Sequence, residues 1–447
     1  MHIQFSKLSR RAFLQMAAAT AAPAILAACA PTAAPTTGGE AAAPAAPSAE
    51  KVTVRYIGMD YDSRMQPDTQ ALFDEFNASQ DEIEGQVEIV SWPDGRNVLL
   101  TQISGGQAPD IFNGGGGWLL EFQSVGELAP LDDLLPADLL DKFWESGIQA
   151  MSVDGTLYGM PYFLDPRGLY YRKDLFDEAG LAEPKTWADI REAAKALHNP
   201  PTLYGIGLGP GDYWWYAWVG AIGGGNNLSR WKEDGKSRVG DPEGIAAVQF
   251  LADLVLTDDV AQPSPASANR DADLQPLFLG GQLAILETGS WMPTIITNDA
   301  PDLQFALAPL PVSDASLNHG NVFWPDAVMM AEQSENKEAA AAVLEFMFNF
   351  ENRLNWALQR GVIPERVDVG EDPRYLDPNS PITPFNEFYV KELATAHNVF
   401  ETPWPATGNE DETTINDALT KVWLGEMTPE QAMTEAAQII DERHGVA

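Results

Sequence analysis

The sequence predicts an α/β protein with two domains. At 447 residues the chain is too long for one compact core, which favours two domains. From residue 51 onward, strand-like and helix-like hydrophobic periods alternate, as in proteins whose helices cover a parallel or mixed sheet. The single cysteine cannot form an internal disulfide, so the fold must depend on its buried core.

The first residues have the composition of an export signal. Lys7, Arg10 and Arg11 precede an apolar, alanine-rich stretch at 13–28 that is too short for a comfortable membrane span. Residues Ser9–Leu14 resemble the twin-arginine signal, which exports proteins that are already folded. The sequence therefore predicts a protein that works outside the cytoplasm.

The only cysteine, Cys29, follows Leu26-Ala27-Ala28, and this segment resembles a bacterial lipobox. In such signals the peptide is cleaved before the cysteine, whose thiol then receives a diacylglyceryl group. We expect a lipoprotein signal peptide at 1–29 and a lipid anchor in the membrane. Residues 30–50 contain almost nothing that can build a core, so we expect a flexible Ala/Pro tether there. The alternative is an ordinary secretory leader with an incidental cysteine.

The formal net charge of −38 limits the partners of the chain. A surface this acidic repels nucleic acid and anionic membrane faces, so we expect no nucleic-acid partner. The charge does not identify a ligand, because charges spread over a surface mostly serve solubility.

The elements of the first predicted domain follow one another in order. Alternation predicts strands at Lys51–Ile57, Gln86–Val90 and Pro109–Phe112, and helical spacing predicts helices at Pro67–Phe76 and Val98–Ile103. In open α/β sheets, ligands bind outside the carboxyl ends of the strands.

That rule selects the segments 58–64, 92–97 and 113–118 as binding loops. The last contains Gly114–Gly117, where missing side chains would let the backbone approach a ligand. A flexible turn is the alternative. No lysine-containing phosphate loop follows, which argues against a nucleotide site.

Five later parts of the chain share a resemblance. They are Val153–Tyr162, Leu169–Phe176 with Pro184–Trp187, Gly281–Trp291, Lys337–Phe348 and Leu424–Ala432. In this order they resemble segments of the family 1 extracellular solute-binding proteins, of which the maltose-binding branch is the closest guide.

The resemblance implies a two-lobe periplasmic-binding-protein fold, with a multi-strand hinge and a ligand cleft between the lobes. The chain would cross near 164–167, 305–309 and 355–361. Lobe one would contain 51–164 plus 309–358, and lobe two 165–308 plus 359–447.

The same resemblance implies the substrate-binding component of an ABC importer. The ligand would be a sugar or oligosaccharide, captured by closure of the cleft. The protein would be monomeric, without a catalytic step or a cofactor, and its protein partners would be the ABC permease subunits.

Carbohydrate recognition uses flat aromatic rings that stack on sugar C–H faces, and polar groups that bind the hydroxyls. Of the 13 tryptophans, Trp144, Trp187, Trp356 and Trp423 fall in helical patterns and are expected to be structural. Trp291 ends a Gly-Ser-Trp segment, a position that stacks on the ligand in the family.

The segment 212–218 is the densest aromatic cluster, and helical spacing allows only one or two of its rings to face a cleft. Asp165 matches an acidic contact of maltose-type binders, or is a turn residue before Pro166. The predicted ligand-binding residues are Asp60, Tyr61, Asp62, Trp118, Asp165, Asp212, Tyr213, Trp214, Trp291, Trp324, Trp404 and Asn409.

Three other functions remain open at this point. Tryptophans beside acids also describe a cage for a cationic ligand such as a polyamine or quaternary amine. A carbohydrate-active enzyme could use a pair such as Asp165 and Glu287, but carboxylates are too abundant here for a pair to carry weight. A sensory protein would read the same closed form. The five histidines lack ligand spacing, so no metal site is expected.

Overall fold

The computed structural model describes residues 51–61, 64–225, 227–394, 396–400 and 407–446. The predicted signal peptide, the tether, Cys29, and the predicted site residues Asp62 and Trp404 lie outside the described residues. Among the helices that are described, none has the length and apolar character needed to cross a membrane.

The first part of the chain alternates strand and helix, as predicted. Its elements are β1 (Val52–Asp60), α2 (Met65–Ser79), β2 (Ile83–Ser91), α3 (Trp92–Ser104), β3 (Ile111–Gly115) and α4 (Gly116–Ser124). Strand β1 pairs in parallel with both β2 and β3. Parallel strands need crossover connections, and α2 and α3 provide them.

Two of the predicted binding loops are not loops. Residues 92–97 form the first turns of α3, because Pro93 at its start has a backbone angle already suited to a helix. Residues 113–118 pass directly from β3 into α4 despite the glycines. Burial of Leu119, Leu120 and Phe122 against the core outweighs the low helix propensity of glycine there.

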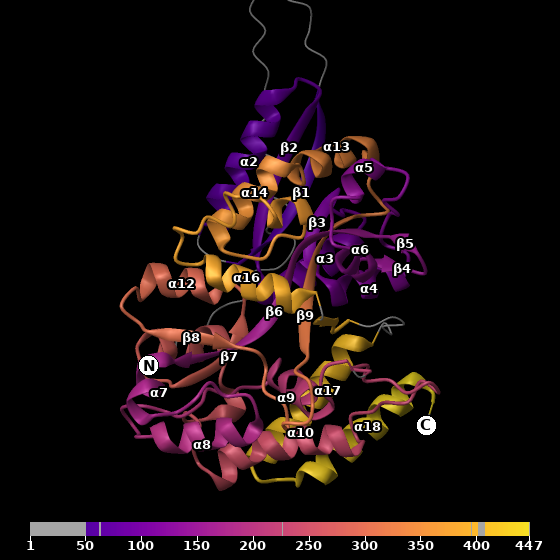
Figure 1. Cartoon of the computed structure of the whole chain (residues 1–447). Helices are drawn as coiled ribbons and strands as arrows, with labels where there is room; N and C mark the ends of the chain where they lie inside the picture. Colours follow the sequence, from indigo (N-terminus) through magenta and orange to yellow (C-terminus); the bar gives the residue numbers. More distant parts are fainter. Residues whose placement is uncertain (1–50, 62–63, 226, 395, 401–406, 447) are drawn as a thin grey trace, which may run out of the picture. The chain divides into compact units, whose positions relative to one another are not determined.

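Two long strands, β6 (Gly159–Arg172) and β9 (Asn321–Met330), connect the parts of the sheet (Figure 1). The first half of β6 pairs antiparallel with β9, and its second half pairs with β7 (Ile285–Gly289) and β8 (Phe305–Ala308). Among the described residues the sheet has eight strands, with the order β2-β1-β3-β9-β6-β7. Strand β8 pairs with β6, and β10 (Ala396–Asn398) pairs with β9.

The segment 305–309, expected to be a crossing, contains the short strand β8, and β9 runs antiparallel along the first half of β6. The lobe borders inferred from the family stay a prediction.

Helices gather at both ends of this sheet. Helices α2 and α13 pack on β1, whereas α9, α10, α17 and α18 pack on one another. The remaining elements are a hairpin of β4 (Ser152–Val153) and β5 (Thr156–Leu157), and the helices α5 (Ala137–Leu140), α6 (Glu145–Ala150), α7 (Lys173–Ala179), α8 (Trp187–Leu197), α9 (Tyr213–Ile222), α10 (Pro242–Ala252), α11 (Gln275–Leu279), α12 (Met292–Asp299), α13 (Lys337–Met347), α14 (Phe350–Arg360), α15 (Val367–Gly370), α16 (Thr383–Leu393), α17 (Gly408–Trp423) and α18 (Pro429–His444). Three short helical segments, η1 (Asp253–Thr257), η2 (Pro265–Ser267) and η3 (Arg270–Leu274), complete the described elements.

Arg353 on α14 forms a buried ion pair and also binds the backbone of β6. The Arg353 guanidinium binds the Glu365 carboxylate at 2.5 and 3.0 Å and donates to the carbonyl oxygen of Tyr162. Both charged residues are almost completely buried, at 3% and 1% exposure. Removal of one partner would leave the other charge buried and uncompensated.

Arg353→Met is therefore expected to lower the free energy of unfolding by about 3–5 kcal/mol in a denaturant titration. Arg374→Met is the control, because Arg374 pairs with Glu351 at an exposed site and should leave the unfolding midpoint nearly unchanged. Equal midpoints for the two variants would contradict the structural role assigned to the buried pair.

Candidate functional site

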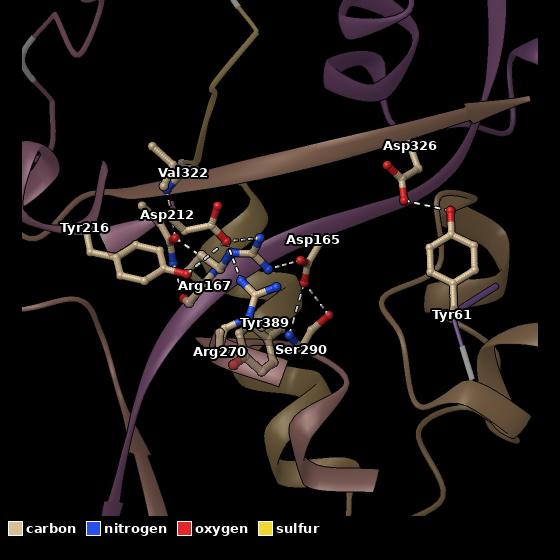
Figure 2. A network of polar contacts seen from close by, with 12 residues as sticks. Tyr61, Asp165, Arg167, Asp212, Tyr216, Arg270, Ser290, Val322, Asp326 and Tyr389 are labelled. Carbon is tan, nitrogen blue, oxygen red and sulfur yellow. Dashed lines mark hydrogen bonds and ion pairs between the residues drawn. The ribbon is translucent and has the colours of Figure 1, made fainter. Parts of the chain in front are cut away.

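A network of four charged side chains lies at the junction of β6 with its neighbours (Figure 2). Asp165 and Arg167 are two residues apart on β6, so their side chains share one face of the sheet. Arg167 forms ion pairs with Asp165 and, at 3.0 Å, with Asp212 at the start of α9. Arg270 also binds Asp212. The two arginines and two aspartates thus balance one another in charge.

Neutral polar groups hold this network in place. Asn321 of β9 accepts from the backbone N–H of Arg167 at 3.1 Å and donates to its carbonyl oxygen at 2.7 Å. The Ser290 N–H and hydroxyl both donate to Asp165 at 3.1 Å. These bonds leave Arg167, which is 3% exposed, little freedom to move.

Two tryptophans flank the charged network. The Arg167 guanidinium lies 4.2 Å from the ring centre of Trp324 and 5.2 Å from that of Trp291, while Arg270 lies 5.0 Å from Trp291. Gly289 permits this approach, since a Cβ there would lie 2.1 Å from the Trp291 ring. Both indoles are only half-buried, so part of each ring stays accessible.

A second cluster continues along the same face of β6 and β9. Asp326 lies two residues after Trp324 on β9 and pairs across the sheet with Phe163, two residues before Asp165. The Tyr61 hydroxyl, just after β1, lies 2.8 Å from Oδ2 of Asp326 (Figure 2).

Aromatic rings extend this second cluster. Tyr61 meets Trp92 edge-on at 5.4 Å, and Trp92 meets Trp118 at 5.1 Å. Edge-to-face contacts of this kind are favourable beyond the area that they bury. Trp92 and Trp118 are half-buried, like Trp291 and Trp324.

The glycines before Trp118 do not leave open space for a ligand, contrary to expectation. A Cβ at Gly114 would lie 2.5 Å from the Trp118 ring, and one at Gly116 would lie 2.9 Å from the Phe400 ring. The missing side chains therefore make room for aromatic neighbours from within the chain, and these glycines position Trp118.

The aromatic helix α9 is buried almost throughout. Trp214 is fully buried and stacks on Trp218 at 5.3 Å, and Tyr213 is 1% exposed, its hydroxyl directed to the carbonyl of Glu287. Neither ring offers a face to a solute in this conformation. The residue of this helix that meets the charged network is Tyr216, 3.4 Å from Asp212 and edge-on to Trp324.

Two other predicted site residues lie elsewhere. Asp60 is exposed at the end of β1, opposite Ser91. Asn409 of α17 donates to Glu121 of α4 at 3.1 Å. It therefore lies near Trp118, apart from the charged network. The structure thus brings together Tyr61, Trp118, Asp165, Asp212, Trp291 and Trp324 along β6 and β9.

The predicted ligand-binding residues do not include Trp92, Arg167, Tyr216, Arg270 or Asp326, although the predicted binding loop 92–97 begins at Trp92. Two signals were available: Arg167 is two residues from Asp165 on a strand, and Trp92 directly follows a strand. No local sequence pattern pointed to Arg270, because it lies 58 residues from its partner Asp212.

The pKa values of several carboxyl groups at this face are shifted, among them that of Asp165, which burial raises. Burial also raises the pKa of Glu287 on β7 and that of Asp326 on β9 to about 8 each. For Asp212, burial acts in the same direction, but the charges of Arg270 and Arg167 outweigh it and the pKa is lowered. In the part of the chain described, no three His, Cys, Asp or Glu side chains are placed to hold a metal ion.

A separate cavity of ≈ 180 Å³ lies along α2 and α14. Its lining includes Leu72, Glu75, Tyr162, Asn352 and Trp356, none of which belongs to the predicted site. The candidate site is the β6–β9 face, since the balanced charges and half-buried indoles converge there.

Comparisons with known proteins agree with this architecture. The chain is 27% identical over 403 residues to a putative binding protein of Brucella abortus, covering 89% of this chain and 94% of that protein. It is 26% identical over 364 residues to an arabinooligosaccharide-binding protein of Halalkalibacterium halodurans, covering 77% and 79% of the two chains.

Among solved structures, the chain resembles an ABC substrate-binding protein of Listeria monocytogenes in complex with cycloalternan. The TM-score is 0.76 at 24% identity, over 89% of this chain and all of that one. The fold is therefore the two-lobe α/β fold of periplasmic binding proteins. The sequence model of the bacterial extracellular solute-binding proteins matches residues 62–353. The chain belongs to the bacterial extracellular solute-binding protein family.

Proposed function

We propose that this protein captures a neutral sugar or oligosaccharide on the β6–β9 face and delivers it to an ABC importer. The observation that carries the proposal is the pairing of half-buried indoles with fixed polar groups. Trp291 and Trp324 flank the charged network, and Trp92 and Trp118 extend the face beyond Tyr61. Aromatic faces for C–H surfaces and polar atoms for hydroxyls are what a carbohydrate requires.

The charge balance favours a neutral ligand over a cation. Arg167 and Arg270 offset Asp165 and Asp212. A pKa of about 8 keeps Glu287 and Asp326 mostly protonated near neutral pH. A cage for a polyamine or quaternary amine would need uncompensated negative charge, whereas the positive guanidinium groups beside Trp291 and Trp324 would repel a cation. Family membership makes the protein a binding protein and not an enzyme.

The names of two relatives support the proposal that the ligand is a carbohydrate. One is named for binding arabinooligosaccharides and another was solved with cycloalternan, so oligosaccharides fit this fold. We place the mature protein outside the cytoplasm, tethered by lipid on Cys29 and the segment 30–50, with ABC permease subunits as partners. Closure of the two lobes, 51–164 plus 309–358 over 165–308 plus 359–447, would trap the solute.

A thermal-shift screen of the purified protein tests the ligand class. We expect neutral mono- or oligosaccharides, and not polyamines or betaines, to raise the melting temperature. A ligand at 100 times its dissociation constant should add about 2.7 kcal/mol of stability. Stabilisation by cationic compounds alone would remove the carbohydrate assignment, and recovery of a cleaved sugar would show an enzyme.

Trp291→Ala tests the aromatic contact. It should weaken sugar binding by about 1–3 kcal/mol in calorimetry while the melting temperature changes little. Trp187→Leu is the control, because Trp187 stacks on Phe250 at 4.4 Å away from the site. That variant should melt earlier and bind normally when folded. A loss of stability in Trp291→Ala as large as its loss of affinity would instead make Trp291 a core residue.

Glu287→Gln tests the neutral state of the site. Because its pKa rises from 4.5 when unfolded to about 8 when folded, Glu287 stabilises the fold below pH 4.5 and loses that contribution as pH rises toward 8. Relative to the wild type, the variant should gain roughly 1 kcal/mol per pH unit across this window. Denaturant titrations at several pH values measure this gain. The exposed Glu178→Gln is the control, and parallel curves for Glu287→Gln and wild type would contradict a protonated Glu287.

A further inference from the structure

The hydroxyl of Tyr61 makes two contacts that one proton cannot satisfy. Its oxygen lies 2.9 Å from Oδ1 of Asn113 and 2.8 Å from Oδ2 of Asp326. The orientation of the Asn113 amide is fixed, since its Nδ2 donates to the carbonyl oxygen of Ala327 at 3.0 Å. Tyr61 therefore faces two acceptor oxygens, and a phenol has a single hydrogen to donate.

We infer that Asp326 is a carboxylic acid that donates its proton to Tyr61, and that this proton selects for a neutral solute. The three groups then form a chain in which each contact contains one hydrogen: Asp326 donates to Tyr61, and Tyr61 donates to Asn113. If Asp326 lost its proton, Tyr61 would turn its hydrogen to the carboxylate. Its oxygen would then face the Asn113 oxygen at 2.9 Å with no hydrogen between them.

The surroundings of Asp326 agree with this assignment. The side chain is 8% exposed, and burial is the largest influence on its pKa, which is raised to about 8. The Asp165 charge acts in the same direction, while the Tyr61 hydrogen bond and the Arg167 charge oppose it. Strand β3 contributes only Asn113 and Gly115, which do not titrate. Burial also raises the pKa of Tyr61, so the phenol keeps its own proton.

The proton matters for binding because Tyr61 supports the aromatic surface. Its ring lies edge-on to Trp92 and to Phe163, each at 5.4 Å. Ionisation of Asp326 would strain the Tyr61–Asn113 contact under this surface and add a negative charge to an otherwise balanced face. That charge would favour a cation, so the bound proton makes Asp326 a specificity-determining residue. This step rests on the proposed function, but the protonation itself does not.

Carboxyl-¹³C NMR of aspartate-labelled protein, without ligand, tests the protonation. One aspartate resonance should titrate near pH 8 and be absent from Asp326→Asn. Its midpoint should shift in Tyr61→Phe, because the side chain that shares a hydrogen bond with this carboxyl group is removed. Titration of every aspartate below about pH 5 would overturn the inference, whatever the protein binds. An unchanged midpoint in Tyr61→Phe would refute the coupling of the two side chains.

Calorimetry with the sugar that gives the largest thermal shift tests the link to binding. Both proteins carry Glu287→Gln, which removes a carboxyl group whose pKa is also raised to about 8. With Asp326 present, affinity should fall about tenfold between pH 7 and pH 9, because only the protonated fraction binds fully. With Asp326→Asn, affinity should not change with pH. Equal pH dependence in the two proteins would overturn the link. Absence of sugar binding at every pH would refute the proposed function and the link together, while the NMR titration would still decide the protonation.

Discussion

The antiparallel pairing of β6 with β9 is the constraint on which the rest of the site depends. It places Asp165 opposite Trp324 and Phe163 opposite Asp326, so residues some 160 positions apart share one face. The Asn321 side chain strengthens this pairing by binding both backbone polar groups of Arg167. The buried guanidinium is then held by two carboxylates, which offset the cost of removing its charge from water.

The aromatic part of the site depends on close packing. The Trp291 ring occupies space that any side chain at position 289 would need, and the Trp118 ring does the same at position 114. Small residues and large rings therefore form complementary pairs, and the rings keep fixed orientations without a ligand. Such preorganisation lowers the entropy that binding must overcome.

Sequence reasoning recovered the order and type of the first strands and helices, because each depends on local hydrophobic periods such as that of β1. It also identified the family from short segments. It placed residues 92–97 and 113–118 in loops, since it could not weigh the burial of Leu119 and Phe122 against the glycines. Trp214 looked like a contact residue by position, but the packing of α9 against α10 and α17 buries it.

Residues of the candidate site could be predicted from the sequence only where their partners are close in the chain or where the residue matches the family pattern. Asp165 and Trp291 fall in that group. Arg270 does not, because its place beside Asp212 depends on how distant segments fold together. The inferred protonation of Asp326 depends on the positions of Tyr61, just after β1, and Asn113, within β3.

Along β9, successive side chains point to opposite faces of the sheet. Trp324 and Asp326 project toward the site, while the hydrogen bonds that hold β9 to β3 and β6 come from the backbone. Substitutions at these two positions would alter the proposed binding surface and leave the backbone pairing of the strands intact. Ligand specificity can therefore change through two alternating positions of one strand, while the stability of the sheet is largely retained.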